Sequence, residues 1–169
     1  LNQLLMQTNW KDLDYLIVDM PPGTGDIQLT LSQQVPVSGA VVVTTPQDIA
    51  AIDARKGLAM FRKVSIPVLG VIENMSTHVC PACGHESAIF GAGGAEAMSA
   101  DFDVELLGQL PLDARVRETT DGGKPTVIAD PESAAAAAFV RTARRTTAAL
   151  AGLGKDYSAA FPKIVVEDT

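Results

Sequence analysis

The sequence of 169 residues is poor in several residue types, and each shortage excludes a class of protein. Two cysteines are too few for a disulfide framework, so we expect a reduced, cytoplasmic thiol or metal site. Basic residues number 13 against 20 acidic ones, and the net charge of −7 argues against binding to nucleic acid or an acidic membrane. No apolar run approaches the roughly 20 residues of a membrane span.

A phosphate-binding loop of the form G-x-x-x-x-G-K-[ST] is also missing from the sequence. Lys124 follows a glycine pair but precedes a proline, and the Gly-rich run 91–96 ends in Glu96 where the dinucleotide fingerprint needs glycine. The sequence begins at Leu1 without a methionine, in a stretch that resembles a short helix over residues 1–10. We therefore expect a piece of a longer protein whose phosphate-cradling element is not in this sequence.

What is present favours one α/β domain. Apolar residues make up 47% of the sequence, and β-branched runs alternate with stretches of helical periodicity. This alternation predicts a parallel sheet with helices on both faces. We place the domain at residues 1–152, with an insert at about 76–90 and a tail at 153–169. The expected strands are 14–18, 39–45, 66–72 and 104–110. The expected helices are 26–34, 48–64 and 93–100, followed by a helical turn at 113–120 and a last helix that opens with Asp130 as its N-cap and is ended by Gly152 and Gly154.

The stretch 19–26 reads Asp-Met-Pro-Pro-Gly-Thr-Gly-Asp and follows the apolar run 14–18 directly. A carboxylate at the end of a buried strand can hold Mg²⁺, which gives Asp19 a role in nucleotide binding. Gly23 has no Cβ and can present its amide closely to a phosphate. The alternative is that Asp19 caps a turn and the glycines only shape it.

The other expected strands lead to Thr45, Asn74 and Pro111, at or just beyond their carboxyl ends. Ligands of parallel sheets bind beyond the carboxyl ends of the strands, so these positions and Asp19 are candidates for one shared site. The Asn74 side chain can donate to and accept from a purine edge. Its alternative is an ordinary turn residue.

Cys80-Pro-Ala-Cys83-Gly places two thiolates where they can bind one metal. A four-coordinate site needs two further ligands. His78 and His85 would complete an internal zinc site, whereas the cysteines of a second subunit would complete an iron–sulfur cluster across a two-fold axis. A redox dithiol and two free thiols are the remaining alternatives.

The order and combination of these motifs resemble the Mrp/ApbC family of iron–sulfur cluster carrier ATPases. This family belongs to the deviant-Walker P-loop group, together with MinD and the nitrogenase iron protein. The resemblance runs from about residue 10 to about residue 150. The motifs that carry it are residues 18–26, 44–47, 70–76, 80–84 and 107–112.

The resemblance implies a partial P-loop NTPase fold that lacks the N-terminal strand and the Walker A loop. It implies that Asp19 is linked to Mg²⁺ and that Gly23 is the switch glycine that responds to the γ-phosphate of ATP. Asn74 would contact adenine, helped by the backbone near Pro111. ATP and Mg²⁺ would bind to the complete protein, and we do not expect this chain alone to hydrolyse ATP.

For the cysteines, the resemblance implies that Cys80 and Cys83 bind a labile [4Fe–4S] cluster shared by the two subunits of a homodimer. The cluster would be transferred to recipient apo iron–sulfur proteins. The competing functions are a zinc-binding interaction module and a MinD-like partitioning ATPase. The C-x-x-C insert and the lack of a basic amphipathic helix at the C-terminus count against MinD-like partitioning.

Overall fold

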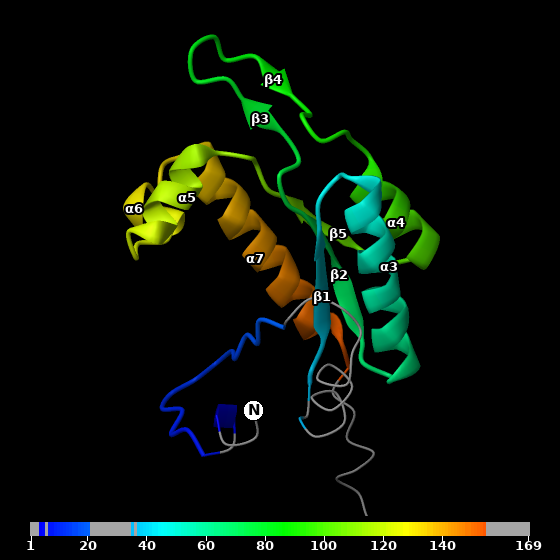
Figure 1. Ribbon diagram of the computed structural model, residues 1–169. Helices are drawn as coiled ribbons and strands as arrows, with labels where there is room; N and C mark the ends of the chain where they lie inside the picture. The colour runs from blue at the N-terminus through cyan, green and yellow to red at the C-terminus, as the bar shows by residue number, and fades with distance from the viewer. Residues whose placement is uncertain (1–3, 6, 21–34, 36, 155–169) are drawn as a thin grey trace, which may run out of the picture.

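A computed structural model describes residues 4, 5, 7–20, 35 and 37–154 of the chain. Its main sheet has three parallel strands in the order β1-β2-β5, and Figure 1 shows them at the centre of the molecule. Ala40 pairs with Val68 across the first interface, and Val71 pairs with Leu106 across the second. The strands are β1 (Ala40–Thr44), β2 (Val68–Glu73) and β5 (Leu106–Gln109).

Helices cover both faces of this sheet. Two of them, α3 and α4, pack on one face, while α7 packs against β5 and β2 on the other (Figure 1). The predicted α/β fold, a parallel sheet with helices on both faces, is therefore confirmed. None of the described helices is both long and apolar enough to cross a membrane. The helices are α3 (Asp48–Lys63), α4 (Gly94–Phe102), α5 (Ala114–Asp121), α6 (Thr126–Ala129) and α7 (Ala134–Gly152).

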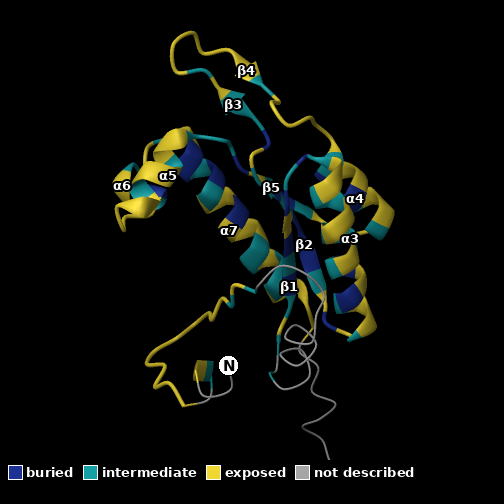
Figure 2. Cartoon of the chain, in the orientation of Figure 1, coloured by how far each residue is buried: buried dark blue, intermediate teal, exposed yellow. Residues whose placement is uncertain are grey.

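The core lies between the sheet and the layer formed by α3 and α4. Val42 and Val71 from the strands meet Leu58 from α3 and Ala95 and Met98 from α4. Figure 2 shows that buried residues lie on the sheet and on the helix faces turned towards it. Burial of these side chains holds the strand ends in fixed positions, and the candidate site is built on those ends.

Small residues bring α7 close to the opposite face of the sheet. Ala135, Ala136 and Thr142 are buried, and a side chain on Gly108 of β5 would collide with Thr142. The prediction that Asp130 caps this helix is wrong. Ser133 is the N-cap, because its Oγ accepts a hydrogen bond from the Ala136 amide at 3.1 Å.

The predicted strand at residues 14–18 is also not observed: the described segment 7–20 contains no strand. Tyr15, Leu16 and Ile17 are exposed, Ile17 to 90%. A strand needs a neighbour to satisfy its backbone hydrogen bonds, and the apolar pattern alone does not supply one. The helix expected at 26–34 lies outside the described residues.

Candidate functional site

The carboxyl ends of β1, β2 and β5 meet at one edge of the sheet. The Asn74 amide donates to the Thr44 carbonyl at 2.7 Å, and the Leu110 amide donates to the Glu73 carbonyl at 2.8 Å. These bonds continue the strand pairing beyond the ends of the strands. The structure therefore brings together three of the strand ends from which a shared site was expected.

Asn74 and Pro111 lie beyond neighbouring strands at this edge. The Asn74 side-chain oxygen accepts a hydrogen bond from the Met75 amide at 3.0 Å, and Met75 has a φ of 56°. A positive φ at a residue other than glycine is uncommon, so the turn after β2 has an unusual, well-defined backbone conformation. The Ser76 amide donates to the Leu110 carbonyl at 2.9 Å, which places this turn beside the residues that lead to Pro111.

Glu73, the residue before Asn74, carries a fully buried carboxylate. Glu73 is 0% exposed, and its Oε1 accepts hydrogen bonds from Ser76 Oγ at 2.8 Å and from Gln109 Nε2 at 3.1 Å. Its Oε2 accepts from the Ala95 amide at 3.1 Å. Buried polar oxygens are costly unless they accept hydrogen bonds, and three donors from three parts of the chain meet that need here.

No role was assigned to Glu73 from the sequence. The signal that could have identified it is a carboxylate at the end of an otherwise apolar strand, followed three residues later by Ser76. A charged residue at such a position is rarely buried without a partner. The identity of the other two donors could not be read from the sequence, because they belong to distant segments.

Cys80 and Cys83 lie at the tip of a short β-hairpin, here called the cysteine hairpin and comprising residues 78–87. Its strands are β3 (His78–Val79) and β4 (Glu86–Ser87), which pair antiparallel. The Cys80 amide donates to the His85 carbonyl at 2.9 Å, and the Gly84 amide donates to the Cys80 carbonyl at 2.8 Å. Figure 1 shows the hairpin projecting away from the sheet, beyond the carboxyl ends of its strands.

The tip of the cysteine hairpin favours the thiolate form of Cys80. The Cys83 backbone amide is the main cause that lowers the pKa of Cys80, followed by the Ala82 amide and the Cys83 side chain. Burial opposes the shift. Amide hydrogen bonds to a sulfur stabilise its negative charge, and the thiolate is the form that binds metals. Cys83 is exposed and Cys80 half-buried, so both can be reached from solvent.

The two histidines near the cysteines have different surroundings. His78 Nδ1 lies 2.9 Å from the Leu112 carbonyl oxygen, whereas His85 is exposed. Within the described residues, no three side chains of the His, Cys, Asp or Glu types gather where they could hold a metal ion. The structure therefore does not support an internal zinc site made by these histidines with Cys80 and Cys83.

Of the stretch 19–26, the structure describes residues 19 and 20, so its glycines lie outside the described residues. Asp19 is exposed and lines a surface hollow of about 330 Å³ together with Leu16 and Val18. In Figure 1 the segment 7–20 lies towards the end of the sheet opposite to the cysteine hairpin. The structure therefore does not bring the segment that contains Asp19 to the edge where Asn74 and Pro111 lie. Gly23 is outside the described residues. The roles of Asp19 in Mg²⁺ binding and of Gly23 in sensing phosphate stay predictions.

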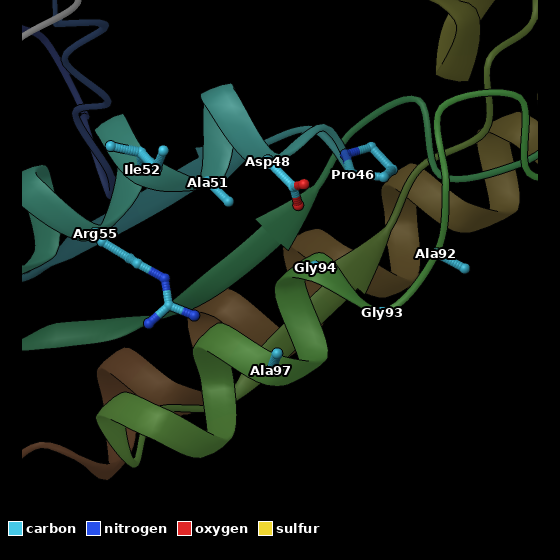
Figure 3. A pocket seen from close by; sticks show the side chains of 9 residues that line it. All are labelled: Pro46, Asp48, Ala51, Ile52, Arg55, Ala92, Gly93, Gly94 and Ala97. Carbon is cyan, nitrogen blue, oxygen red and sulfur yellow. The ribbon is translucent and has the colours of Figure 1, made fainter.

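A second hollow, of about 430 Å³, opens between the first turns of α3 and α4 (Figure 3). Its described lining has two charged residues, Asp48 and Arg55, and Arg55 also pairs with Asp101 at 2.7 Å. Gly94 lies so close to Pro46 that a Cβ on it would be 3.1 Å from the Pro46 carbonyl oxygen. The two helix starts are thus packed against each other beside the strand ends, and the hollow has no excess of either charge.

Comparison with known proteins identifies the family. Residues 1–147 match the family model described as ParA, NUBPL iron-transfer P-loop NTPase. The chain is 60% identical over 150 residues to an iron–sulfur cluster carrier protein of Haemophilus influenzae, covering 89% of this chain and 40% of that protein. It is 52% identical over 143 residues to the mouse iron–sulfur cluster transfer protein NUBPL, covering 85% of this chain and 45% of that protein. The chain thus spans less than half the length of these relatives.

Solved structures agree with this assignment. A nucleotide-binding protein from Archaeoglobus fulgidus, in complex with ADP, superimposes with a TM-score of 0.67 at 35% identity, covering 78% of this chain and 53% of that one. The cell division ATPase MinD from Pyrococcus furiosus has a TM-score of 0.53 at 29% identity, covering 66% of this chain and 43% of that one. Fold and sequence together show that this chain belongs to the ParA family of NUBPL-type iron-transfer P-loop NTPases.

Proposed function

We propose that this chain binds an iron–sulfur cluster through Cys80 and Cys83 and passes it to recipient proteins. The observation that carries the proposal is the exposed hairpin tip that presents both thiols and lowers the pKa of Cys80 through backbone amides. Iron–sulfur clusters are held by thiolates, and amide hydrogen bonds to sulfur tune them. The names of the relatives, iron–sulfur cluster carrier and transfer proteins, support this function.

The cluster would be a [4Fe–4S] cluster shared by two copies of the chain. Such a cluster needs four thiolate ligands, and one cysteine hairpin supplies two. Among the described residues, no group of three or more His, Cys, Asp or Glu side chains is arranged to hold a metal ion within one chain. A hairpin that projects from the body of the domain (Figure 1) can meet the same hairpin of a second copy across a two-fold axis.

ATP binding and hydrolysis would be coupled to cluster transfer in the complete protein. Asn74 and the backbone around Pro111 would contact adenine at the carboxyl edge of the sheet, where α/β proteins bind nucleotides. Asp19 would be linked to Mg²⁺, and Gly23 would respond to the γ-phosphate. The ADP in the related Archaeoglobus protein supports a nucleotide site in this fold.

Anaerobic reconstitution with iron and sulfide tests the cluster proposal. We expect about four irons per dimer, visible absorption of the cluster, and loss of both when Cys80 and Cys83 are replaced by alanine. The matched control is His85→Ala, which a cluster shared across two subunits should tolerate. A cluster that forms in the double cysteine variant would contradict the proposal. So would zinc bound at one ion per chain that is lost in His85→Ala.

Transfer is tested by mixing the loaded chain with an apo iron–sulfur protein and following the acceptor's spectrum or activity. We expect the acceptor to gain its cluster faster from the loaded chain than from free iron and sulfide in the presence of a chelator. An acceptor that is reconstituted only when the chelator is omitted would show release into solution and would contradict direct transfer.

A further inference from the structure

His78 lies at the base of the cysteine hairpin and bonds to the loop that follows β5, here called the 110–112 loop. Its Nδ1 is 2.9 Å from the carbonyl oxygen of Leu112. A carbonyl oxygen can only accept a hydrogen bond, so Nδ1 carries the proton and donates. His78 is half-buried, which limits the water available to replace this bond.

Backbone hydrogen bonds reinforce the same contact. The Ser76 amide donates to the Leu110 carbonyl at 2.9 Å, and the Leu112 amide donates to the Thr77 carbonyl at 2.8 Å. The chain that enters the cysteine hairpin therefore runs alongside the 110–112 loop. The His78 side chain adds a bond at the hairpin end of this contact, two residues before Cys80.

The chain that leaves the cysteine hairpin makes its first bond to the base of the hairpin many residues after the thiols. After β4, residues 88–93 are exposed, and the next bond from this side to the base of the hairpin is that of the Ala95 amide to Glu73. His78 pairs with Ser87 across the hairpin, so fixing His78 fixes both hairpin strands. The orientation of the thiols thus depends mainly on the entering strand and its contact with Leu112.

We propose that His78 is a positioning residue whose bond to Leu112 orients the cysteine hairpin on the 110–112 loop. The proposal rests on the proposed function, in which the backbone around Pro111 contacts the nucleotide and the two thiols bind the cluster. Pro111 is covalently bonded to Leu112, so the carbonyl that holds His78 is adjacent in the chain to the residue assigned to the nucleotide.

The test compares three variants of the whole metal-free chain: His78→Ala, His78→Asn and His85→Ala. Asparagine places an amide nitrogen near the position of Nδ1 and can keep the donor, whereas alanine cannot. Hydrogen exchange is measured at the amides of Cys80, Gly84 and Leu112. We expect His78→Ala to speed exchange at these amides by about fivefold, as for loss of one hydrogen bond. His78→Asn should stay within about twofold of the wild type, and His85→Ala should match it.

Two further readouts separate positioning from general stability. The Val71 amide, which donates to the Glu105 carbonyl in the sheet, should exchange at the wild-type rate in all three variants. Alkylation of Cys80, the half-buried thiol, by iodoacetamide should be faster in His78→Ala alone. Unchanged hairpin exchange in His78→Ala, equal acceleration at Val71, or no recovery in His78→Asn would each overturn the proposal.

The same variants separate this proposal from the proposed function. If the wild-type chain assembles no cluster, the proposed function fails, while the exchange rates still decide the role of His78. If the cluster forms, a chelator should remove its iron faster from His78→Ala than from His85→Ala. Equal rates of iron loss would overturn the positioning role and leave cluster binding intact.

Discussion

The Glu73 carboxylate accepts a hydrogen bond from the Ala95 amide, with 3.1 Å between Oε2 and the nitrogen. The two residues are 22 positions apart, and the whole cysteine hairpin lies between them. The other carboxylate oxygen accepts from Ser76 Oγ at 2.8 Å. One buried side chain therefore accepts hydrogen bonds from both ends of the segment that carries Cys80 and Cys83.

Glu73→Gln should destabilise the fold by about 1–3 kcal/mol, because one amide group cannot replace two acceptor oxygens. The Gln oxygen can face Ser76 and Gln109, but its NH₂ group then meets the Ala95 amide, and both are donors. The measurement is urea unfolding, analysed by linear extrapolation.

The matched control for this change is Glu105→Gln. Glu105 pairs with Arg145 at 2.9 Å, but its side chain is 46% exposed. A surface ion pair contributes about 0–1 kcal/mol, so this variant should stay near the wild type. Equal losses in the two variants would contradict a special role for the buried carboxylate.

The reactivity of Cys80 should depend on pH in a way that reports its lowered pKa. In Cys83→Ser, the rate of alkylation of Cys80 by iodoacetamide should reach half its maximum below pH 9.0, the ordinary value for a thiol. The backbone amides of residues 83 and 82 remain in this variant, and they are the main causes of the shift. The folded chain should therefore react faster at neutral pH than the chain unfolded in guanidinium chloride.

The same shift links folding to pH. A thiol whose pKa is lower when folded stabilises the folded chain at pH values above its unfolded pKa, and the effect is lost as the pH falls through the folded pKa. Comparing the alkylation profiles of the folded and unfolded chain shows directly whether folding lowers the pKa of Cys80. A folded profile with the higher midpoint would show that burial outweighs the amide hydrogen bonds.

Asp113 is the N-cap of α5 and should stabilise the fold both as a cap and as a charge. Its side chain accepts from the Arg115 amide at 2.9 Å, and the Arg115 side-chain hydrogen bond is the main cause that lowers the pKa of Asp113 below 3.8. Asp113→Ala should cost about 1 kcal/mol at neutral pH, whereas Asp113→Asn, also a good cap, should cost less. Thermal unfolding measures both.

The acid dependence distinguishes the two contributions of Asp113. Because its folded pKa is lowered, the charge contribution is present above pH 3.8 and is lost as the pH falls through the folded pKa. Stability should therefore fall less between pH 4 and pH 2 in Asp113→Asn than in the wild type, and the difference should be small because Arg115 is 65% exposed. Parallel pH curves for the two proteins would contradict this link.

Gly108→Ala should destabilise the chain by about 1–3 kcal/mol, the usual cost of overpacking. The new methyl group would collide with Thr142 where α7 crosses β5. Thr142→Gly removes the atoms nearest to it, so the double variant should cost less than the sum of the single changes in a double-mutant cycle. Gly57→Ala is the control, since nothing lies within 4 Å of its Cβ position.

The sequence predicted the sheet and its helices well wherever a segment had a strong pattern of its own. The runs at 39–45 and 66–72 became β1 and β2, and the run at 48–64 became α3. Apolar, β-branched runs and helical periodicity are local properties, and burial on the sheet reinforces them. The start of α7 was missed because Asp130 and Ser133 are both good caps, and only backbone geometry selects between them.

The segment at 14–18 shows that an apolar, strand-like pattern is not enough to form a strand. Its residues have the composition of a buried strand, yet Ile17 is 90% exposed. The cysteine hairpin shows the opposite case, since two-residue strands are too short to leave an alternating pattern in the sequence. In both cases the outcome depends on whether a partner strand is adjacent, which the residues themselves do not specify.

The sequence by itself determined the α/β class, the position of the paired cysteines and the motifs that indicate the family, because each depends on residues close together in the chain. The tertiary structure decided that Glu73 is buried beneath the site and that His78 bonds to Leu112 rather than joining the cysteines. These contacts link residues 22 and 34 positions apart. They depend on the sheet, which brings the strand ends together, so no local pattern encodes them.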